Sequence, residues 1–214
     1  MTKLCVTRHG ETDWNIAQIL QGWVDVPMND TGRRQALELA ESLAPYGFSR
    51  VSTSPLRRSA ETAEIIAQVW GLPAPDAHEG LKERHFGLIQ GMPKSELSLT
   101  HPGLYEEIQR RNPACHFDEG ESLDHFADRV LGALDDIASA HSTDRILVIT
   151  HGWVMDVITR HIQGLARDTV LNLKRKNGES VWLEVTPHAT LCECEAPQRV
   201  NRTVTRPLHP EKAV

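Results

Sequence analysis

Two short runs of mostly apolar, partly β-branched residues constrain the fold of this 214-residue chain more than any other feature. They cover residues 4–7 and 146–150, and each leads directly into side chains that can do chemistry: Arg8 and His9 after the first, His151 after the second. Such runs are typical of strands buried on both faces of a parallel sheet. Ligands of open α/β sheets bind outside the carboxyl ends of the strands. The sequence therefore predicts a functional site at the ends of these two strands.

Amphipathic segments alternate with the predicted strands. Alternation of this kind predicts an α/β fold: a mostly parallel central sheet with helices on both faces. Residues 181–185 and 190–195 alternate in polarity and predict an added antiparallel edge. We expect one domain over residues 1–196 and an irregular tail over 197–214. Apolar residues with helical spacing predict helices from about residue 30 to Gly47, over 56–70 and 122–140, and from 152 to 162. The periodicity is poor over 87–120, where short helices are expected around 94–100 and 103–111, and a further strand is predicted at Val51 and Ser52.

Composition excludes several classes of function. A net charge of −6 argues against nucleic acid as a partner, because duplex binding requires a basic face. No run approaches the roughly 18 apolar residues of a membrane-spanning helix, and the first strand begins too early for a signal peptide. We therefore expect a cytoplasmic protein with no membrane partner. The four cysteines contain no CxxC pair, which fits a reducing compartment and gives no reason to expect a metal: Cys5, Cys115, Cys192 and Cys194.

Two further charged side chains fit the same sheet edge. Arg58 follows the predicted strand at residues 51–54, with Arg57 as an alternative beside it, and Glu83 lies in the segment 81–87. Two arginines, two histidines and one carboxyl group meeting at one edge would bind a phosphoryl group and supply an acid for the leaving oxygen. The residues themselves thus point to phosphoryl chemistry.

These motifs also carry a family resemblance. Arg8, His9 and Gly10 resemble the RHG signature of the histidine phosphatase superfamily, also called the phosphoglycerate mutase-like family. The family's other motifs have counterparts in the same order, and the match covers residues 1 to about 165. Four separated motifs in strand context are far more specific than one tripeptide. The matching positions after the first motif are Ser54, Leu56 and Arg58, then Glu83, then His151 and Gly152.

The resemblance implies a catalytic role for five residues. His9 would be the nucleophile, since a neutral imidazole can attack phosphorus and the phosphohistidine formed can still be hydrolysed. Glu83 would be the general acid and base, with Glu11 as the next candidate. The remaining three would hold the phosphoryl oxygens: Arg8, Arg58 and His151.

Five further residues are predicted to bind substrate. Asn15 matches a motif asparagine, Arg84 is positioned to serve a substrate carboxylate, and Gly152 lets the backbone approach a ligand. Gln21 and Gly22 lie in a loop expected over the site. We predict no metal and no cofactor, because the chain has neither a P-loop nor a His-Glu-x-x-His pattern and cationic clamps can support phosphoryl transfer.

Within the family, two activities compete. The segment 81–94 resembles the cofactor-dependent mutases, but Glu83 and His151 are only 68 positions apart (151 − 83), fewer than in mutases, which use a longer insertion to retain their intermediate. The shorter cover favours a phosphomonoester hydrolase acting on a small phosphorylated metabolite. A phosphoglycerate mutase and a non-catalytic phospho-ligand-binding module remain the alternatives. The expected partner is a small phosphate ester, and a homodimer is left open.

Overall fold

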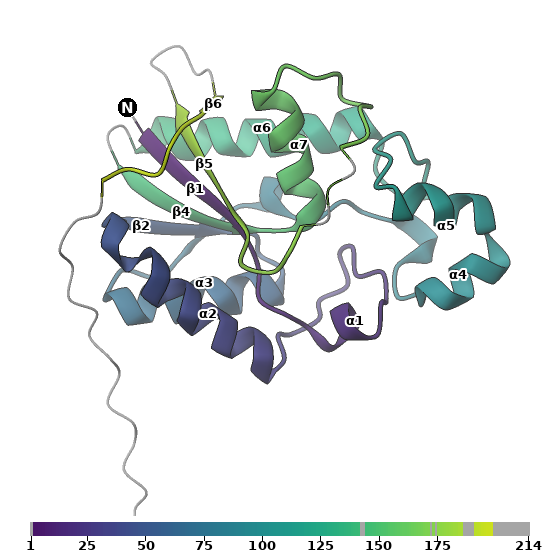
Figure 1. Ribbon diagram of the computed structural model, residues 1–214, viewed down its shortest axis with the longest axis horizontal. Coiled ribbons are helices and arrows are strands. Elements are labelled where there is room, and N and C mark those ends of the chain that lie inside the picture. Colours follow the sequence, from purple (N-terminus) through teal and green to yellow (C-terminus); the bar gives the residue numbers. More distant parts are fainter. Residues whose placement is uncertain (1, 142–143, 172, 174, 186–190, 199–214) are drawn as a thin grey trace, which may run out of the picture.

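A six-stranded sheet forms the centre of the described part of the chain (Figure 1). The structure, a computed structural model, describes residues 2–141, 144–171, 173, 175–185 and 191–198. Within these residues the strand order is β3-β2-β4-β1-β5-β6. The strands are β1 (Thr2–Arg8), β2 (Arg50–Thr53), β3 (Asp76–Ala77), β4 (Arg145–Thr150), β5 (Ser180–Val185) and β6 (Leu191–Glu193).

The sheet is parallel except at one edge. Strands β3, β2, β4 and β1 run parallel, whereas β5 is antiparallel to β1 and β6 is antiparallel to β5. The predicted mostly parallel sheet with an antiparallel edge is confirmed. Only the two-residue strand β3 was not expected, because its two exposed residues carry no apolar pattern. The predicted division into one domain and a tail stays a prediction, since residues 199–214 lie outside the described residues.

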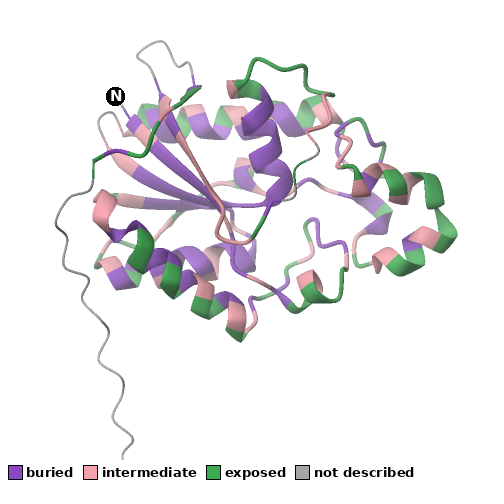
Figure 2. Cartoon of the chain, in the orientation of Figure 1, coloured by how far each residue is buried: buried purple, intermediate pink, exposed green. Residues whose placement is uncertain are grey.

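Helices cover both faces of the sheet, as predicted. Helices α2 (Asp30–Leu43) and α3 (Arg57–Trp70) lie on one face, and α6 (Leu123–Ala140) and α7 (Gly152–Ile162) lie on the other (Figure 1). The side chains of the two central strands divide between these layers. In β4, Leu147 and Ile149 join the α2/α3 core, whereas Ile146 and Val148 join the α6/α7 core. Figure 2 shows the resulting burial of the central strands.

Local sequence explains where these helices begin and end. The Asn29 side chain accepts the Gly32 N–H at the start of α2, and Ser122 accepts the His125 N–H at the start of α6. The helix expected to run to Gly47 instead leaves the α conformation after Leu43 and finishes as a 3-10 turn, η1 (Ala44–Tyr46). Pro45 explains this difference, because it has no N–H to continue the α-helical ladder.

The remaining helical segments gather beyond the carboxyl ends of the parallel strands (Figure 1). They are α1 (Asp13–Ile16), η2 (Glu79–Leu81), η3 (Gly87–Ile89), α4 (Lys94–Thr100) and α5 (Pro102–Gln109). Of these short elements, α1, α4 and α5 contribute residues to the outer wall of the cavity described below. None of the helices in the described ranges combines the length and the apolar character needed to cross a membrane.

Candidate active site

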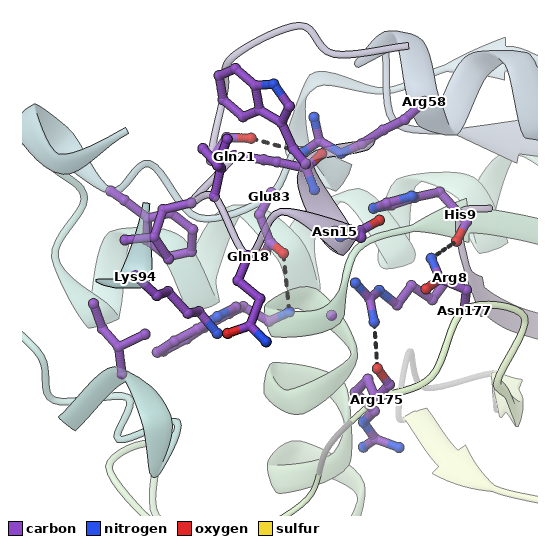
Figure 3. Close-up of a pocket in the computed structure, with 18 of the residues that line it drawn as sticks. Arg8, His9, Asn15, Gln18, Gln21, Arg58, Glu83, Lys94, Arg175 and Asn177 are labelled. Carbon is purple, nitrogen blue, oxygen red and sulfur yellow. Dashed lines mark hydrogen bonds between the residues drawn. The ribbon is translucent and has the colours of Figure 1, made fainter. Parts of the chain in front are cut away.

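A cavity of about 450 Å³ opens at the carboxyl ends of β1 and β4 (Figure 3). Its inner side is formed by residues that follow the strands, and its outer side by segments between residues 14 and 22 and between 94 and 111. Four of the predicted catalytic residues line this cavity: Arg8, His9, Arg58 and Glu83. The fifth, His151, lies directly behind His9, and the centres of the two imidazole rings are 5.1 Å apart.

The parallel pairing of β1 with β4 brings the two histidines together. Arg8 is the register partner of Thr150, and the His9 N–H continues the ladder by donating to the Thr150 carbonyl at 2.9 Å. Each strand therefore ends with an imidazole at the same level of the sheet. This proximity follows from sheet geometry, although 142 positions (151 − 9) separate the two residues in the sequence.

The protonation of His9 suits a nucleophile. Its Nδ1 lies 2.6 Å from the Gly10 carbonyl oxygen, which can only accept, so Nδ1 carries the proton and Nε2 carries the lone pair. The ring is 3% exposed. Burial, together with the charges of Arg58 and Arg8, holds the pKa of His9 well below its usual range. His9 is therefore neutral at physiological pH, with an unprotonated Nε2.

The two arginines have buried N–H groups available for an anion. Arg58 is 1% exposed and donates through Nη1 to the Val24 carbonyl (3.0 Å) and through Nη2 to the Gly22 carbonyl (2.8 Å). Arg8 donates through Nη1 to the Arg175 carbonyl. The Nε atoms of both arginines are buried without a hydrogen-bond partner among the described residues. Burial lowers the pKa of Arg58 to about 10, so it stays cationic and favours an anion beside it.

Arg57, the alternative to Arg58, has a different environment. Its guanidinium is largely exposed and donates to the Glu61 carboxylate at 2.7 Å. It does not line the cavity. The α3 helix begins at Arg57, so consecutive side chains point about 100° apart around the helix axis and only one of the pair can face the site.

Glu83 has the environment of a proton donor. Its carboxylate oxygens accept the Arg84 N–H at 3.0 Å and the Trp153 N–H at 3.4 Å. Burial raises the pKa of Glu83 above its usual value, although these N–H groups and the charges of Arg111 and Arg58 oppose the rise. Glu11 also lines the cavity, but its carboxylate is engaged by the Asn29 amide at 3.1 Å.

The backbone at Glu83 is fixed by a second layer of side chains. Arg129 donates to the carbonyls of Gly80, Lys82 and Glu83 at 2.8–2.9 Å. The same guanidinium is held by the Glu121 carboxylate at 2.6 and 2.7 Å. The indole N–H of Trp23 also donates to the Glu83 carbonyl, at 2.6 Å. These bonds fix the direction in which the Glu83 side chain leaves the backbone.

Four of the five predicted substrate-binding residues line the cavity: Asn15, Gln21, Gly22 and Gly152. The Asn15 carboxamide oxygen accepts the Thr12 N–H at 3.0 Å, which orients its amide group. The Gln21 side-chain oxygen is buried without a partner among the described residues. Gly22 has a φ of +52°, and a Cβ there would lie 2.1 Å from the Gln90 side-chain oxygen, so this turn requires glycine.

The structure contradicts the role predicted for Arg84. Its guanidinium is 1% exposed and points away from the cavity, donating to the carbonyls of Pro113, Cys115 and Glu121 at 2.7, 2.9 and 3.1 Å. It also lies 4.7 Å from the Phe117 ring centre. Arg84 therefore fixes the segment 113–121 and is not available to a substrate carboxylate. Its neighbour Glu83, by contrast, lines the cavity.

Sequence reasoning missed a cationic cluster beside Arg8, whose guanidinium donates to the Arg175 carbonyl (Figure 3). Arg111 and Arg175 line the cavity and share the carboxylate of Asp156, which is 1% exposed. Arg111 Nε lies 2.6 Å from one Asp156 oxygen and Arg175 Nε lies 3.1 Å from the other. Lys94 and Asn177 add polar groups (Figure 3). No sequence signal identifies this cluster, because its members come from three distant segments without a common motif.

Comparison with known proteins agrees with this arrangement. The sequence model of the histidine phosphatase superfamily (branch 1) matches residues 4–195. The chain is 36% identical over 164 residues to an uncharacterized phosphatase, PhoE, of Bacillus subtilis (strain 168), which covers 77% of this chain and 79% of that protein. It is 36% identical over 160 residues to a metal-independent phosphoserine phosphatase of Arabidopsis thaliana, covering 74% of this chain and 67% of the relative.

A solved structure shares the fold. YhfR of Bacillus stearothermophilus superposes on this chain with a TM-score of 0.82 at 28% sequence identity, over 90% of this chain and 95% of that one.

Proposed function

This chain belongs to the histidine phosphatase superfamily, and we propose that it hydrolyses phosphomonoesters of small metabolites through a phosphohistidine on His9. The observation that carries the proposal is the state of His9. A neutral imidazole with its Nδ1 proton committed to the Gly10 carbonyl lies near Arg58, which is buried, and Arg8, which is half-buried, and the Nε–H of each arginine has no partner among the described residues. This is the combination that an in-line attack on a phosphate dianion requires.

In the first step, the Nε2 lone pair of His9 attacks phosphorus and the bond to the leaving oxygen breaks. Arg8 and Arg58 bind the equatorial oxygens, where charge is concentrated in the transition state. Glu83 donates its proton to the leaving oxygen, so the alcohol departs uncharged. The raised pKa of Glu83 favours this role, because a larger fraction of the carboxyl group is protonated near neutral pH.

In the second step, water replaces the alcohol. Glu83, now a carboxylate, takes a proton from the water molecule as its oxygen attacks the phosphorus of the phosphohistidine. The P–N bond breaks, inorganic phosphate leaves, and His9 returns to its neutral state. Each proton that Glu83 gives in the first step is recovered in the second.

Hydrolysis is supported over mutase transfer by two features. Fewer residues are available between Glu83 and His151 to cover the site than in the mutases, so water reaches the phosphohistidine sooner. Two relatives that match three quarters of the chain carry the name phosphatase. For the substrate, the cavity of about 450 Å³ supports a small phosphorylated metabolite. Cytoplasmic location and a homodimer stay predictions.

The test is turnover and trapping with purified protein. We expect release of p-nitrophenol from p-nitrophenyl phosphate in the presence of a chelator, and an acid-labile, alkali-stable phosphoryl group on the protein after rapid quenching. The His9→Ala variant should lose turnover by at least about 10⁴-fold and form no such adduct. Conversion of 3-phosphoglycerate to 2-phosphoglycerate that outpaces phosphate release would instead identify a mutase. Binding of phosphate without turnover would identify the non-catalytic module.

A further inference from the structure

Ser54 is buried behind the two histidines, outside the set of residues that line the cavity. It directly follows β2 and is 0% exposed, as is His151. Its hydroxyl oxygen lies 2.8 Å from His151 Nε2 and accepts the Leu56 N–H at 3.3 Å. Among the residues that the structure describes, the hydroxyl has no other hydrogen-bond partner.

The directions of these two bonds follow from counting protons. If His151 carried its proton on Nε2, the Ser54 oxygen would accept from both neighbours and its own hydrogen would have no acceptor in a fully buried site. If the hydroxyl donates to Nε2, it accepts one bond and donates one, and only the His151 Nδ1–H is left unpaired, whereas the first arrangement leaves both the hydroxyl hydrogen and the Nδ1 lone pair unpaired. The second arrangement leaves the single proton of a neutral His151 on Nδ1.

His151 Nδ1 is the atom that lacks a partner in the part of the chain that the structure describes. A buried N–H group without an acceptor is unfavourable unless a ligand supplies one. The centres of the His151 and His9 rings are 5.1 Å apart, so an oxygen of a phosphoryl group on His9 lies beside the second ring.

We propose that Ser54 is a positioning residue that fixes His151 as its Nδ1–H tautomer, so that His151 presents a donor to the phosphoryl group. The inference rests on the proposed function for its catalytic consequence, but the tautomer is a property of the resting protein. The wrong tautomer would present a lone pair to an anion and repel it. Burial and the charges of Arg58, His9 and Arg8 lower the pKa of His151 and keep its ring neutral. A neutral ring has a proton on only one nitrogen, so the tautomer decides which nitrogen can donate.

The chain offers a matched control for the loss of a buried hydroxyl. Ser59 is also 0% exposed, and its hydroxyl lies 3.0 Å from the Thr53 hydroxyl and donates to the Ile149 carbonyl at 2.8 Å. It makes no contact with either histidine. Ser59→Ala therefore removes a comparable buried hydroxyl from the same region and should leave the tautomer of His151 unchanged.

The direct test is NMR of protein labelled with ¹⁵N-histidine, which distinguishes a protonated from an unprotonated ring nitrogen. The His151 signals are assigned by their loss in His151→Gln. We expect wild-type protein and Ser59→Ala to show protonated Nδ1 and unprotonated Nε2, and Ser54→Ala to show a mixture of tautomers. Protonated Nε2 in the wild-type protein overturns the proposal whether or not the enzyme turns over. Absence of turnover with the expected tautomer would contradict the proposed function alone.

Kinetics supply the second readout. Ser54→Ala should lower kcat for p-nitrophenyl phosphate by about tenfold, the effect of losing one charge-assisted hydrogen bond in the transition state, with KM changed by less than about twofold. Ser54→Thr keeps a hydroxyl group and should recover most of the rate, and Ser59→Ala should retain it. Wild-type kcat in Ser54→Ala, or equal losses in Ser54→Ala and Ser59→Ala, would overturn the proposal.

Discussion

The two sides of the cavity are built on different principles. The inner side, which holds the phosphate clamp, is made of residues that directly follow parallel strands, so backbone pairing sets their positions. The outer side comes from short helices and loops, and side chains hold the segments that flank it. Arg84 and Arg129 together bind six backbone carbonyls, those of residues 80, 82, 83, 113, 115 and 121. A sheet fixes its own residues, whereas a loop wall needs buried charges to fix it.

This contrast has a chemical consequence. At the inner side, the buried N–H groups of Arg8 and Arg58 lack partners, which leaves binding capacity for a ligand. Arg84 shows the same pattern as Arg58, with both terminal nitrogens engaged by the protein and Nε without a partner among the described residues, but it does not line the cavity. Burial of an arginine is therefore not by itself evidence of a binding role. The position of the guanidinium at the cavity, as for Arg58, or away from it, as for Arg84, decides whether it can meet a substrate.

The largest effect that tests the contrast is expected at Glu83, where both sides meet. Glu83→Gln removes the proton donor, so we expect kcat for an alkyl phosphate to fall by roughly 10²–10³-fold and kcat for p-nitrophenyl phosphate to fall much less, because its leaving group needs little protonation. In the wild-type protein the rate with alkyl esters should decline as the pH rises through the raised pKa of Glu83, since the active form is protonated.

The measurement is a series of esters with leaving groups of graded pKa. Steeper leaving-group dependence in Glu83→Gln than in the wild-type protein is the expected outcome. Equal slowing of all esters would show that Glu83 does not act as the acid and would leave Glu11 as the candidate.

The next largest effect is expected on stability, at Arg84. Arg84→Met keeps much of the side-chain volume but leaves three buried carbonyls without their donors, so we expect a loss of about 3 kcal/mol in the free energy of unfolding. Urea denaturation measures it. At a temperature where the variant stays folded, KM should be close to the wild-type value. A large rise in KM with unchanged stability would restore the substrate-binding role that the structure contradicts.

Arg111 differs from Arg84 in that its side chain lines the cavity and can meet a substrate. Arg175 remains to neutralise Asp156 when Arg111 is removed. Arg111→Met should raise KM for an ester that carries a carboxylate, such as 3-phosphoglycerate, by about tenfold relative to phenyl phosphate, because a cation is lost beside the second anion. Equal changes for the two esters would show that the outer wall does not distinguish substrates by charge.

The last effect is a pH dependence of stability to which the inner side contributes through its two buried histidines. The pKa values of His9 and His151 are lowered in the folded protein, so between those values and about 6.5 the unfolded chain binds more protons. Stability should therefore decrease as the pH falls below about 6.5, by up to about 1.4 kcal/mol per pH unit for each ring. The outer pair Glu121–Arg129 should contribute nothing there, because the pKa of Glu121 is lowered and its stabilisation is lost only in more acidic solution.

Denaturation of Glu83→Gln between pH 7.5 and 5.5 measures this dependence, since Glu83 has a raised pKa and contributes with the opposite sign. Adding His9→Ala to that background should reduce the slope. An unchanged slope would mean that His9 is not buried as a neutral ring.

The sequence by itself determined the inner side of this site. Residues 4–7 and 146–150 are apolar enough to be buried strands, and parallel strands must present their carboxyl ends at one edge, so His9 and His151 had to meet there. The predicted strand at residues 51–54 placed an arginine at the same edge, but the choice of Arg58 over Arg57 came from the family resemblance. The strand positions follow from periodicity and backbone pairing, which are properties of short segments and can be recognised along a single chain.

Only the tertiary structure decided the outer side. Nothing in the sequence shows that Arg84 faces away from the cavity while Arg111 faces into it, or that Asp156 joins Arg111 to Arg175. Each of these outcomes depends on which distant carbonyl or carboxylate a long, flexible side chain reaches once the segments have docked. Local propensity carries no information about such partners. Which partner a buried charged side chain takes depends on the free energy of burying that charge in the assembled fold.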